Sequence, residues 1–260
     1  RHLGRLDHPR SVGPALGGFL SSRSPEAAYI AAAALFVAAG TCAAVIRSRR
    51  ATRATEPLTL ESVFSGVAFI WSRRVLLGTM SLDLFAVLLG GATALLPVYA
   101  RDILDAGPRG LGLLRSAPAV GALATSIFLA RYPLRRRIGP ALFRTVIVFG
   151  AATIVFGLST SFTLSLVALA VLGASDVVSV VIRASLVQIR TPDTMRGRVS
   201  AVHSLFTGTS NQLGAFESGL VAALVGTVPS VLLGGIGTIA VAVLWMLLFP
   251  ELRRVRQFEE

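Results

Sequence analysis

Clusters of arginine separate the long apolar segments of this chain, and they occur in every second gap between those segments. All 25 basic residues are Arg, and the chain contains no Lys. Five Arg and no acidic residue lie between Arg131 and Arg144, whereas the next gap, Ser159–Thr163, carries no charge. Basic residues near the ends of membrane-crossing segments stay on the cytoplasmic side. The alternation therefore predicts a polytopic membrane protein and assigns each gap to one side of the membrane.

The composition supports a membrane protein. The chain is 53% hydrophobic and 15% charged, which is atypical of soluble globular domains. A formal net charge of +12 often indicates a nucleic-acid partner. Here the arginines lie at segment ends, where anionic lipid of the cytoplasmic leaflet explains them. We therefore predict the lipid bilayer, and no nucleic acid, as a partner. Cys42 is the single cysteine, which excludes a disulfide within the chain and a Cys-based metal site.

A segment of about 20 apolar residues is needed to cross the hydrocarbon layer as a helix. Six or seven segments qualify: Ala27–Ile46, Val75–Val98, Leu111–Ala130, Thr145–Leu158 with its extension back to Ala141, Leu164–Ile182, Val199–Val225 and Val231–Phe249. All Tyr and Trp residues lie at segment ends, as in an interfacial aromatic belt: Tyr29, Trp71, Tyr99, Tyr132 and Trp245. Glycines inside the segments favour close helix packing. The predicted fold class is all-α, a polytopic transmembrane helical bundle.

A different helix is predicted between Arg53 and Arg73. Its apolar residues recur at helical spacing, with polar residues opposite: Leu60, Val63, Phe64, Val67 and Trp71. This pattern predicts an amphipathic helix on the cytoplasmic surface, with Trp71 at the headgroup level, that links two halves of the protein. The alternative is an ordinary helix packed on protein, which is disfavoured because the chain has no soluble domain to receive it.

Four stretches carry a family resemblance: Gly13-Pro14-Ala15-Leu16-Gly17-Gly18, Ser81–Ala92, Arg190–Val202 and Phe249–Arg254. They resemble drug and siderophore exporters of the major facilitator superfamily, in the enterobactin-exporter-like branch of transmembrane secretion effectors. In that family Gly13, Pro14, Gly17 and Gly18 would form a helix-packing motif in helix five.

The resemblance covers roughly residues 11–256 and implies a domain organisation. Residues 1–10 are an unmatched polar start, 11–46 hold the end of helix five and helix six, 47–74 form the cytoplasmic linker, 75–250 form a six-helix C-terminal half, and 251–260 form a cytoplasmic tail. The half would consist of two inverted three-helix repeats. Helices one to four would be absent from this chain, so the missing N-terminal helices of the same transporter are an expected partner.

The function implied is proton-coupled efflux of small organic molecules, drug-like or siderophore-like, by alternating access in the bacterial cytoplasmic (inner) membrane. The C-terminus would be cytoplasmic, and no cofactor is expected. The alternative is a truncated, non-transporting membrane fragment or scaffold. An enzyme is disfavoured because the sequence contains no catalytic or metal-binding motif.

Ionisable residues inside membrane segments tend to face the bundle interior or a wet cavity. Asp83 is predicted to line the transport cavity and to recognise a cation or a proton, with structural pairing to a neighbouring helix as the alternative. Asp176 is equally compatible with both roles. Arg183 follows Asp176 by seven residues, about 10 Å along a helix, so we expect no direct pair between them. Arg183 is instead predicted to anchor the cytoplasmic end of its helix.

The predicted eleventh helix contains the most polar stretch of any segment. Its small residues Gly208, Ser210, Gly214, Ser218 and Gly219 favour tight packing, and Asn211 is suited to an interhelical hydrogen bond. Glu217 is predicted either to carry a proton or to pair with Arg115, at a similar depth in helix eight. His203, near the cytoplasmic end, is predicted to snorkel or to cap the helix.

Two arginine clusters, together with Arg183, are candidates for a cytoplasmic gate. Arg135, Arg136 and Arg137 lie in a short loop that partly resembles the gate motif of the superfamily, and their alternative role is to anchor the protein to lipid. Arg196 and Arg198 are expected to bind helix-end carbonyls or lipid headgroups. No residues have the spacing of a metal site.

Overall fold

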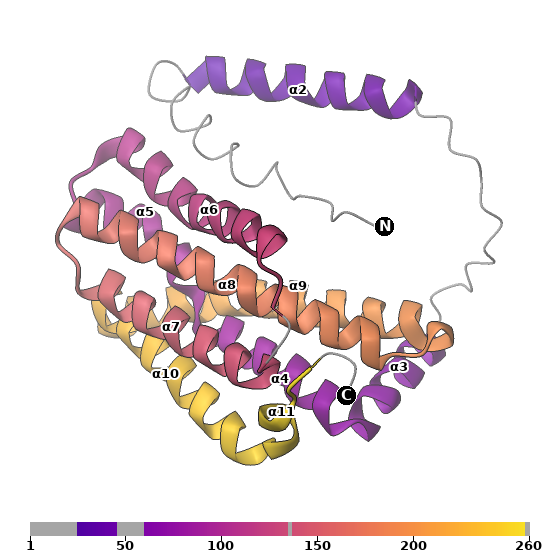
Figure 1. Cartoon of the computed structure of the whole chain (residues 1–260). Coiled ribbons are helices and arrows are strands. Elements are labelled where there is room, and N and C mark those ends of the chain that lie inside the picture. The colour runs from indigo at the N-terminus through magenta and orange to yellow at the C-terminus, as the bar shows by residue number, and fades with distance from the viewer. Residues whose placement is uncertain (1–24, 46–59, 135–136, 258–260) are drawn as a thin grey trace.

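The computed structural model describes residues 25–45, 60–134 and 137–257, and the elements within them are helices (Figure 1). They are α2 (Pro25–Val45), α3 (Leu60–Ser72), α4 (Arg74–Leu89), the 3₁₀-helix η1 (Gly91–Leu95), α5 (Leu96–Val98), the π-helix η2 (Tyr99–Ile103), α6 (Gly107–Arg131), α7 (Ile138–Leu158), α8 (Phe162–Arg190), α9 (Asp193–Val225), α10 (Thr227–Leu248) and α11 (Pro250–Arg254). The predicted all-α fold class is confirmed.

Five helical stretches in the described part of the chain are long and apolar enough to cross a membrane. They are the composite stretch Arg74–Ile103 and the helices α6, α7, α8 and α10. Helix α9 is longer than α6, α7, α8 and α10, but its polar residues keep it out of this group. In α2, the apolar part described, Ala33–Cys42, is shorter than a span. The expected set of six or seven spans is therefore reduced to five by this criterion, although α9 packs within the bundle.

The helices pack in two related sets. Helix α8 packs against α6 and α7, while α4 packs against α9 and α10, and α7 contacts α10. The first helix of each three-helix unit thus lies beside the second and third helices of the other unit. This exchange of neighbours is the arrangement expected of two interlocking inverted repeats, and it confirms the predicted bundle.

Glycines bring the paired helices into backbone contact. A Cβ added at Gly173 of α8 would overlap the carbonyl of Pro118 in α6, and one at Gly121 of α6 would overlap the carbonyl of Ala170 in α8. The α6–α8 interface therefore admits no side chain at either glycine. The prediction that glycines permit close helix packing is confirmed here.

The related α4–α9 interface uses the same device at Gly214. A Cβ there would lie 2.8 Å from the carbonyl oxygen of Leu88, closer than side chains tolerate. Ser210 and Ser218 are also buried. At Gly208 and Gly219, however, no described atom lies within 4 Å of an added Cβ. The predicted packing role is wrong for these two glycines within the described residues.

The predicted span Val75–Val98 is a broken helix. Helix α4 ends at Leu89, and Gly90, η1, α5 and η2 follow. Gly91 is held against α9, where an added Cβ would overlap Ser218 and the carbonyl of Gly214. Pro97 has no N–H to continue a helical ladder. Irregular backbone at membrane depth is tolerated where protein covers it, and here α9 and α10 contact η1.

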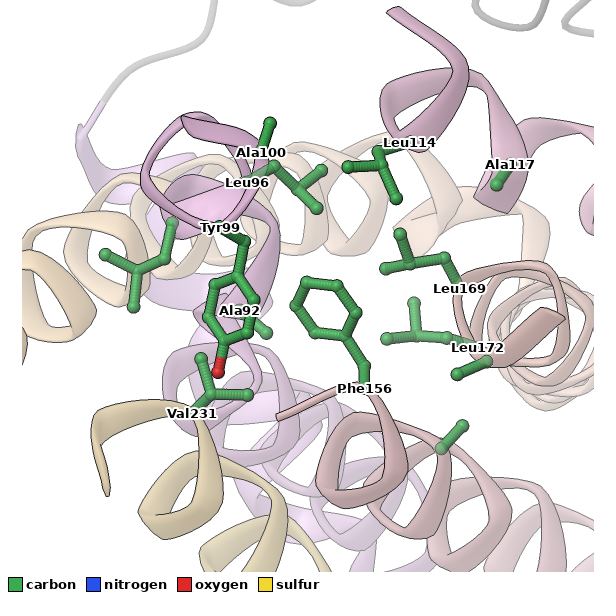
Figure 2. Close-up of a cluster of buried hydrophobic side chains, with 13 residues drawn as sticks. Ala92, Leu96, Tyr99, Ala100, Leu114, Ala117, Phe156, Leu169, Leu172 and Val231 are labelled. Carbon is green, nitrogen blue, oxygen red and sulfur yellow. The ribbon is translucent and has the colours of Figure 1, made fainter. Parts of the chain in front are cut away.

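The end of the bundle that holds η2 is closed by a buried apolar cluster (Figure 2). Tyr99 lies at its centre: its ring is 4.5 Å from that of Phe156, centroid to centroid, and its hydroxyl donates to the carbonyl of Gly157 at 3.0 Å. The aromatic-belt prediction is therefore wrong for Tyr99, whose hydroxyl finds its partner inside the protein. Trp245 also turns inward, and its Nε1–H donates to Ser81 Oγ at 2.9 Å.

The other aromatic end residues differ. Trp71 is 71% exposed and Tyr132 is 63% exposed, as a belt requires, while the side chain of Tyr29 lies outside the described ones.

Helix α3 forms where the amphipathic pattern predicts it, but it has a protein partner. Ile70 is buried with Val199 and Val202 of α9, and a Cβ on Gly66 would lie 3.0 Å from Val202. The argument that the chain offers this helix no partner is therefore wrong, because the first turns of α9 extend far enough to receive it. Phe64 and Trp71 remain exposed, which leaves an apolar face of α3 for the membrane surface.

Candidate functional site

Four ionisable side chains from three helices form one cluster. Arg183 of α8 makes an ion pair with Asp83 of α4 through Nη1 and Oδ1, and each side chain is 7% exposed. His203 of α9 places Nε2 4.0 Å from the second carboxylate oxygen of Asp83. The structural alternative for Asp83, a partner on a neighbouring helix, is what the fold provides.

Arg183 also reaches Asp176 on its own helix. Its Nη2 lies 3.9 Å from Asp176 Oδ1, which contradicts the expectation that these residues cannot pair. The error lies in comparing Cα positions alone. Side chains on a helix lean towards its N-terminus, so the long guanidinium side chain of Arg183 covers most of the axial separation. Arg183 is buried among helices rather than placed as an anchor at the helix end.

The cluster occupies one layer of the bundle. Asp83 lies nine residues after Arg74, the start of α4, and His203 lies ten residues after Asp193, the start of α9. Arg183 lies seven residues before Arg190, the end of α8. These offsets place all three about 10–15 Å from the same end of the bundle. Equal depth is a sequence signal that is compatible with the Asp83–Arg183 pair, but only the packing of α4 against α8 selects it.

A small cavity adjoins the cluster. It has a volume of about 20 Å³, and its polar lining comes from Thr145, Ser175, Asp176, Ser179 and Arg183. Ser179 Oγ is buried and has no hydrogen-bond partner among the described residues. A cavity of this size holds one water when polar groups line it. The side chain of Asp176 is 49% exposed, so the cluster combines a half-exposed carboxylate with the buried Asp83–Arg183 ion pair.

A buried ion pair of this kind constrains the helices that carry it. Removing two charges from water costs several kcal/mol per ion, which mutual attraction offsets only with good geometry. Each charge is therefore stable only while the other is present. The pair links α4 to α8, although α4 packs mainly against α9 and α10. His203, expected to snorkel or cap, instead faces this pair.

Glu217 and Arg115 are not brought together. Arg115 is exposed on α6, which packs mainly against α8, whereas Glu217 is half-buried on α9 beside α4 and α10. No ion pair joins them within the described residues, because equal depth does not make two helices neighbours. Asn211, expected to bond another helix, donates to the carbonyl of Thr207 in its own helix at 2.8 Å.

The candidate gate arginines have separate partners. Arg196 pairs with Asp193 at 2.7 Å and donates to the carbonyl of Gln188, near the end of α8, at 3.3 Å. The prediction that Arg196 binds a helix-end carbonyl is confirmed. Arg198 instead donates to Ser65 Oγ of α3 at 3.4 Å.

The backbone N–H of Arg137 donates to the carbonyl of Arg256 at 2.8 Å. Arg135, Arg136 and the motif Gly13, Pro14, Gly17 and Gly18 lie outside the described residues.

Comparison with known proteins agrees with this architecture. The family model described as transmembrane secretion effector matches residues 6–259. The chain belongs to the transmembrane secretion effectors of the major facilitator superfamily. This is a family of membrane efflux transporters.

Curated relatives include the enterobactin exporters EntS of Citrobacter koseri and of Escherichia coli O1:K1. Each is 28% identical over 200 residues, which cover 76% of this chain and 47% of the relative. The exporter of Escherichia coli O139:H28 is 26% identical over 198 residues. The chain thus spans about half the length of the curated relatives it matches. No solved structure matches it significantly.

Proposed function

We propose that this transmembrane secretion effector chain forms the C-terminal half of a proton-coupled exporter of small organic molecules in the bacterial cytoplasmic membrane. N-terminal helices of the same transporter complete the transport unit. The observation that carries the proposal is the buried Asp83–Arg183 pair between α4 and α8, with a second carboxylate, Asp176, on the same arginine. Because relatives are named enterobactin exporters, the substrate class is drug-like or siderophore-like.

Proton coupling follows from competition between the two carboxylates for Arg183. A charged Asp83 holds the guanidinium and ties α4 to α8. Protonation of Asp83 removes that attraction, so Arg183 favours Asp176 and α4 is released. Proton binding then shifts the population between two arrangements of the bundle, as alternating access requires. The polar cavity beside Ser179 gives a water, and hence a proton, a place next to Asp176 and to the Arg183 side chain that both carboxylates share.

Efflux driven by a proton gradient tests this function. The test uses everted membrane vesicles from cells that express the whole reading frame containing this chain. In these vesicles a catecholate siderophore or a fluorescent cationic drug should accumulate only when the lumen is acidified. Asp176→Asn should lower the gradient-driven rate at least tenfold, because Arg183 loses its alternative partner.

The matched control is Asp193→Asn, which removes an exposed carboxylate paired with Arg196. This variant should keep the rate of the parent. Equal rates for Asp176→Asn and the parent would contradict the coupling mechanism, whereas accumulation that ignores the gradient would contradict proton coupling itself.

The membrane orientation is a second expected outcome. In a Cys42→Ser background, single cysteines should be labelled from the inside at Arg50, Arg136 and Arg196, and from the outside at Asp105, Thr160 and Val228. The C-terminus would then be cytoplasmic, since the arginine clusters stay on that side. An impermeant maleimide that labels position 136 in intact cells would overturn this orientation.

A second proposal, a non-transporting membrane scaffold, rests on α2. Its side chains Ile30, Phe36 and Val37 are 70%, 78% and 68% exposed, and this apolar surface is suited to contact with other membrane helices. Absence of accumulation under every gradient, together with co-purification of another membrane protein that an α2 charge substitution abolishes, would favour this function.

A further inference from the structure

Five arginines surround one large open cavity at the end of the bundle where α7 begins. The cavity has a volume of about 950 Å³ and is lined by Arg137, Arg144, Arg253, Arg254 and Arg256, together with two prolines. None of its described lining residues belongs to the Asp83–Arg183 cluster, and the proton-coupled efflux mechanism proposed above does not use this cavity.

The cavity is built by the tail of the chain, which the sequence predicted only as a cytoplasmic extension. After α10 the chain turns into α11, and Leu252 is fully buried in the apolar cluster that includes Ile138 and Leu142 of α7. The N–H of Gly139 donates to the carbonyl of Val255 at 3.0 Å. The fold itself therefore holds the tail arginines opposite those of α7.

Gly139 shows how close this contact is. A Cβ at that position would overlap the carbonyl of Leu252, so the tail lies directly on the first turn of α7. Together with the Arg137–Arg256 backbone hydrogen bond, this contact fixes the spacing between the two groups of arginines. The cluster is thus part of the packed structure.

The described residues that line the cavity carry charges of one sign. No Asp or Glu among the described residues lines it, and the acidic residue of α11, Glu251, lies 3.7 Å from Arg74 instead. Like charges held near one another repel unless a counter-ion reduces the repulsion. Guanidinium groups bind phosphate oxygens in a bidentate manner, so the site favours a ligand that bears more than one phosphate charge.

Apolar surface continues from the cavity into the membrane-facing side of the bundle. Val148 follows Arg144 by one helical turn on the same face of α7 and is 44% exposed. Leu247 and Leu248, just before the Pro250 that lines the cavity, are 71% and 57% exposed. A ligand that places phosphate on the arginines would thus have hydrocarbon contacts beside it.

We propose that this cavity binds the headgroup of an anionic phospholipid, with a lipid of two linked phosphates preferred, and that its acyl chains lie along α7 and α10. Basic pockets between helices on the cytoplasmic side suit such headgroups. The proposal commits to lipid over free phosphate because charge and exposed apolar surface adjoin each other.

Native mass spectrometry of the full 260-residue chain in detergent tests the proposal. Cardiolipin should remain bound at a higher fraction than phosphatidylglycerol, and phosphatidylethanolamine should be lost. Arg253→Gln with Arg254→Gln should lower the bound cardiolipin at least tenfold. The matched control, Arg101→Gln with Arg131→Gln, removes the same charge from outside the cavity and should retain it.

Folding and ligand source are controlled separately. The variant Arg253→Lys with Arg254→Lys keeps the charge and should retain more cardiolipin than the Gln variant, even if both elute as the parent does. Equal lipid loss from the cavity and control variants would overturn the site. Release of cardiolipin by equimolar inorganic pyrophosphate would overturn the lipid assignment, because the arginines would then recognise phosphate alone.

Discussion

Replacing Arg183 with Gln is expected to destabilise the helical bundle by about 3–5 kcal/mol, because it leaves a buried carboxylate without its counter-charge. Asp83 is 7% exposed, and its remaining neighbour, His203, lies 4.0 Å away. Thermal unfolding of the purified chain in detergent should show a fall in midpoint on the order of 10 °C.

A double-mutant cycle measures the coupling energy between Asp83 and Arg183 apart from the effect of each single substitution. Asp83→Asn combined with Arg183→Gln removes both charges and should recover most of the stability lost in the single variants. The exposed pair Arg74–Glu251, at 3.7 Å, is the matched control, and its loss should cost less than about 1 kcal/mol. A double variant as unstable as the sum of its singles would show that the two charges do not depend on each other.

Gly173→Ala is the second substitution with a large expected effect. The added methyl group would overlap the carbonyl of Pro118, which is backbone and cannot rotate away. Helices α6 and α8 must separate, at a cost on the order of 3 kcal/mol. We expect the variant to lose most of its folded, monodisperse fraction in size-exclusion chromatography.

Gly208→Ala is the control for that substitution, because it makes the same change at a position where no described neighbour lies within 4 Å of the added Cβ. It should behave as the parent does. If Gly173→Ala and Gly208→Ala gave the same folded fraction, contact at the α6–α8 interface would not explain the effect.

Several parts of the site could be read from residue type and position alone. A carboxylate at Asp83 and another at Asp176 stand out because charges are costly at membrane depth. The sequence also indicated where helices begin and end, since arginines and short polar gaps interrupt the apolar runs. Helix α7, for example, extends from Ile138 to Leu158, so it begins three residues before Ala141, the predicted start, and ends at the predicted residue.

Partners could not be read in the same way. Pairing depends on which helices are neighbours, and that is decided by packing between segments far apart in sequence. Arg115 and Glu217 have similar depths but lie on helices with different neighbours, whereas Asp83 and Arg183 meet although 100 positions separate them. The axial distance between the backbone positions of Arg183 and Asp176 also gave the wrong expectation, because the arginine side chain is long enough to reach the carboxylate.

Local composition was sufficient to predict the membrane character, the helical segments and the side of each loop, because burial of apolar surface and the placement of charge depend on nearby residues. Packing between distant segments produced the break after Leu89, the docking of the tail on α7 and the partners of the buried charges. These features arise where segments far apart in the sequence come into contact, and the pattern of residue types along the chain does not specify which segments do so.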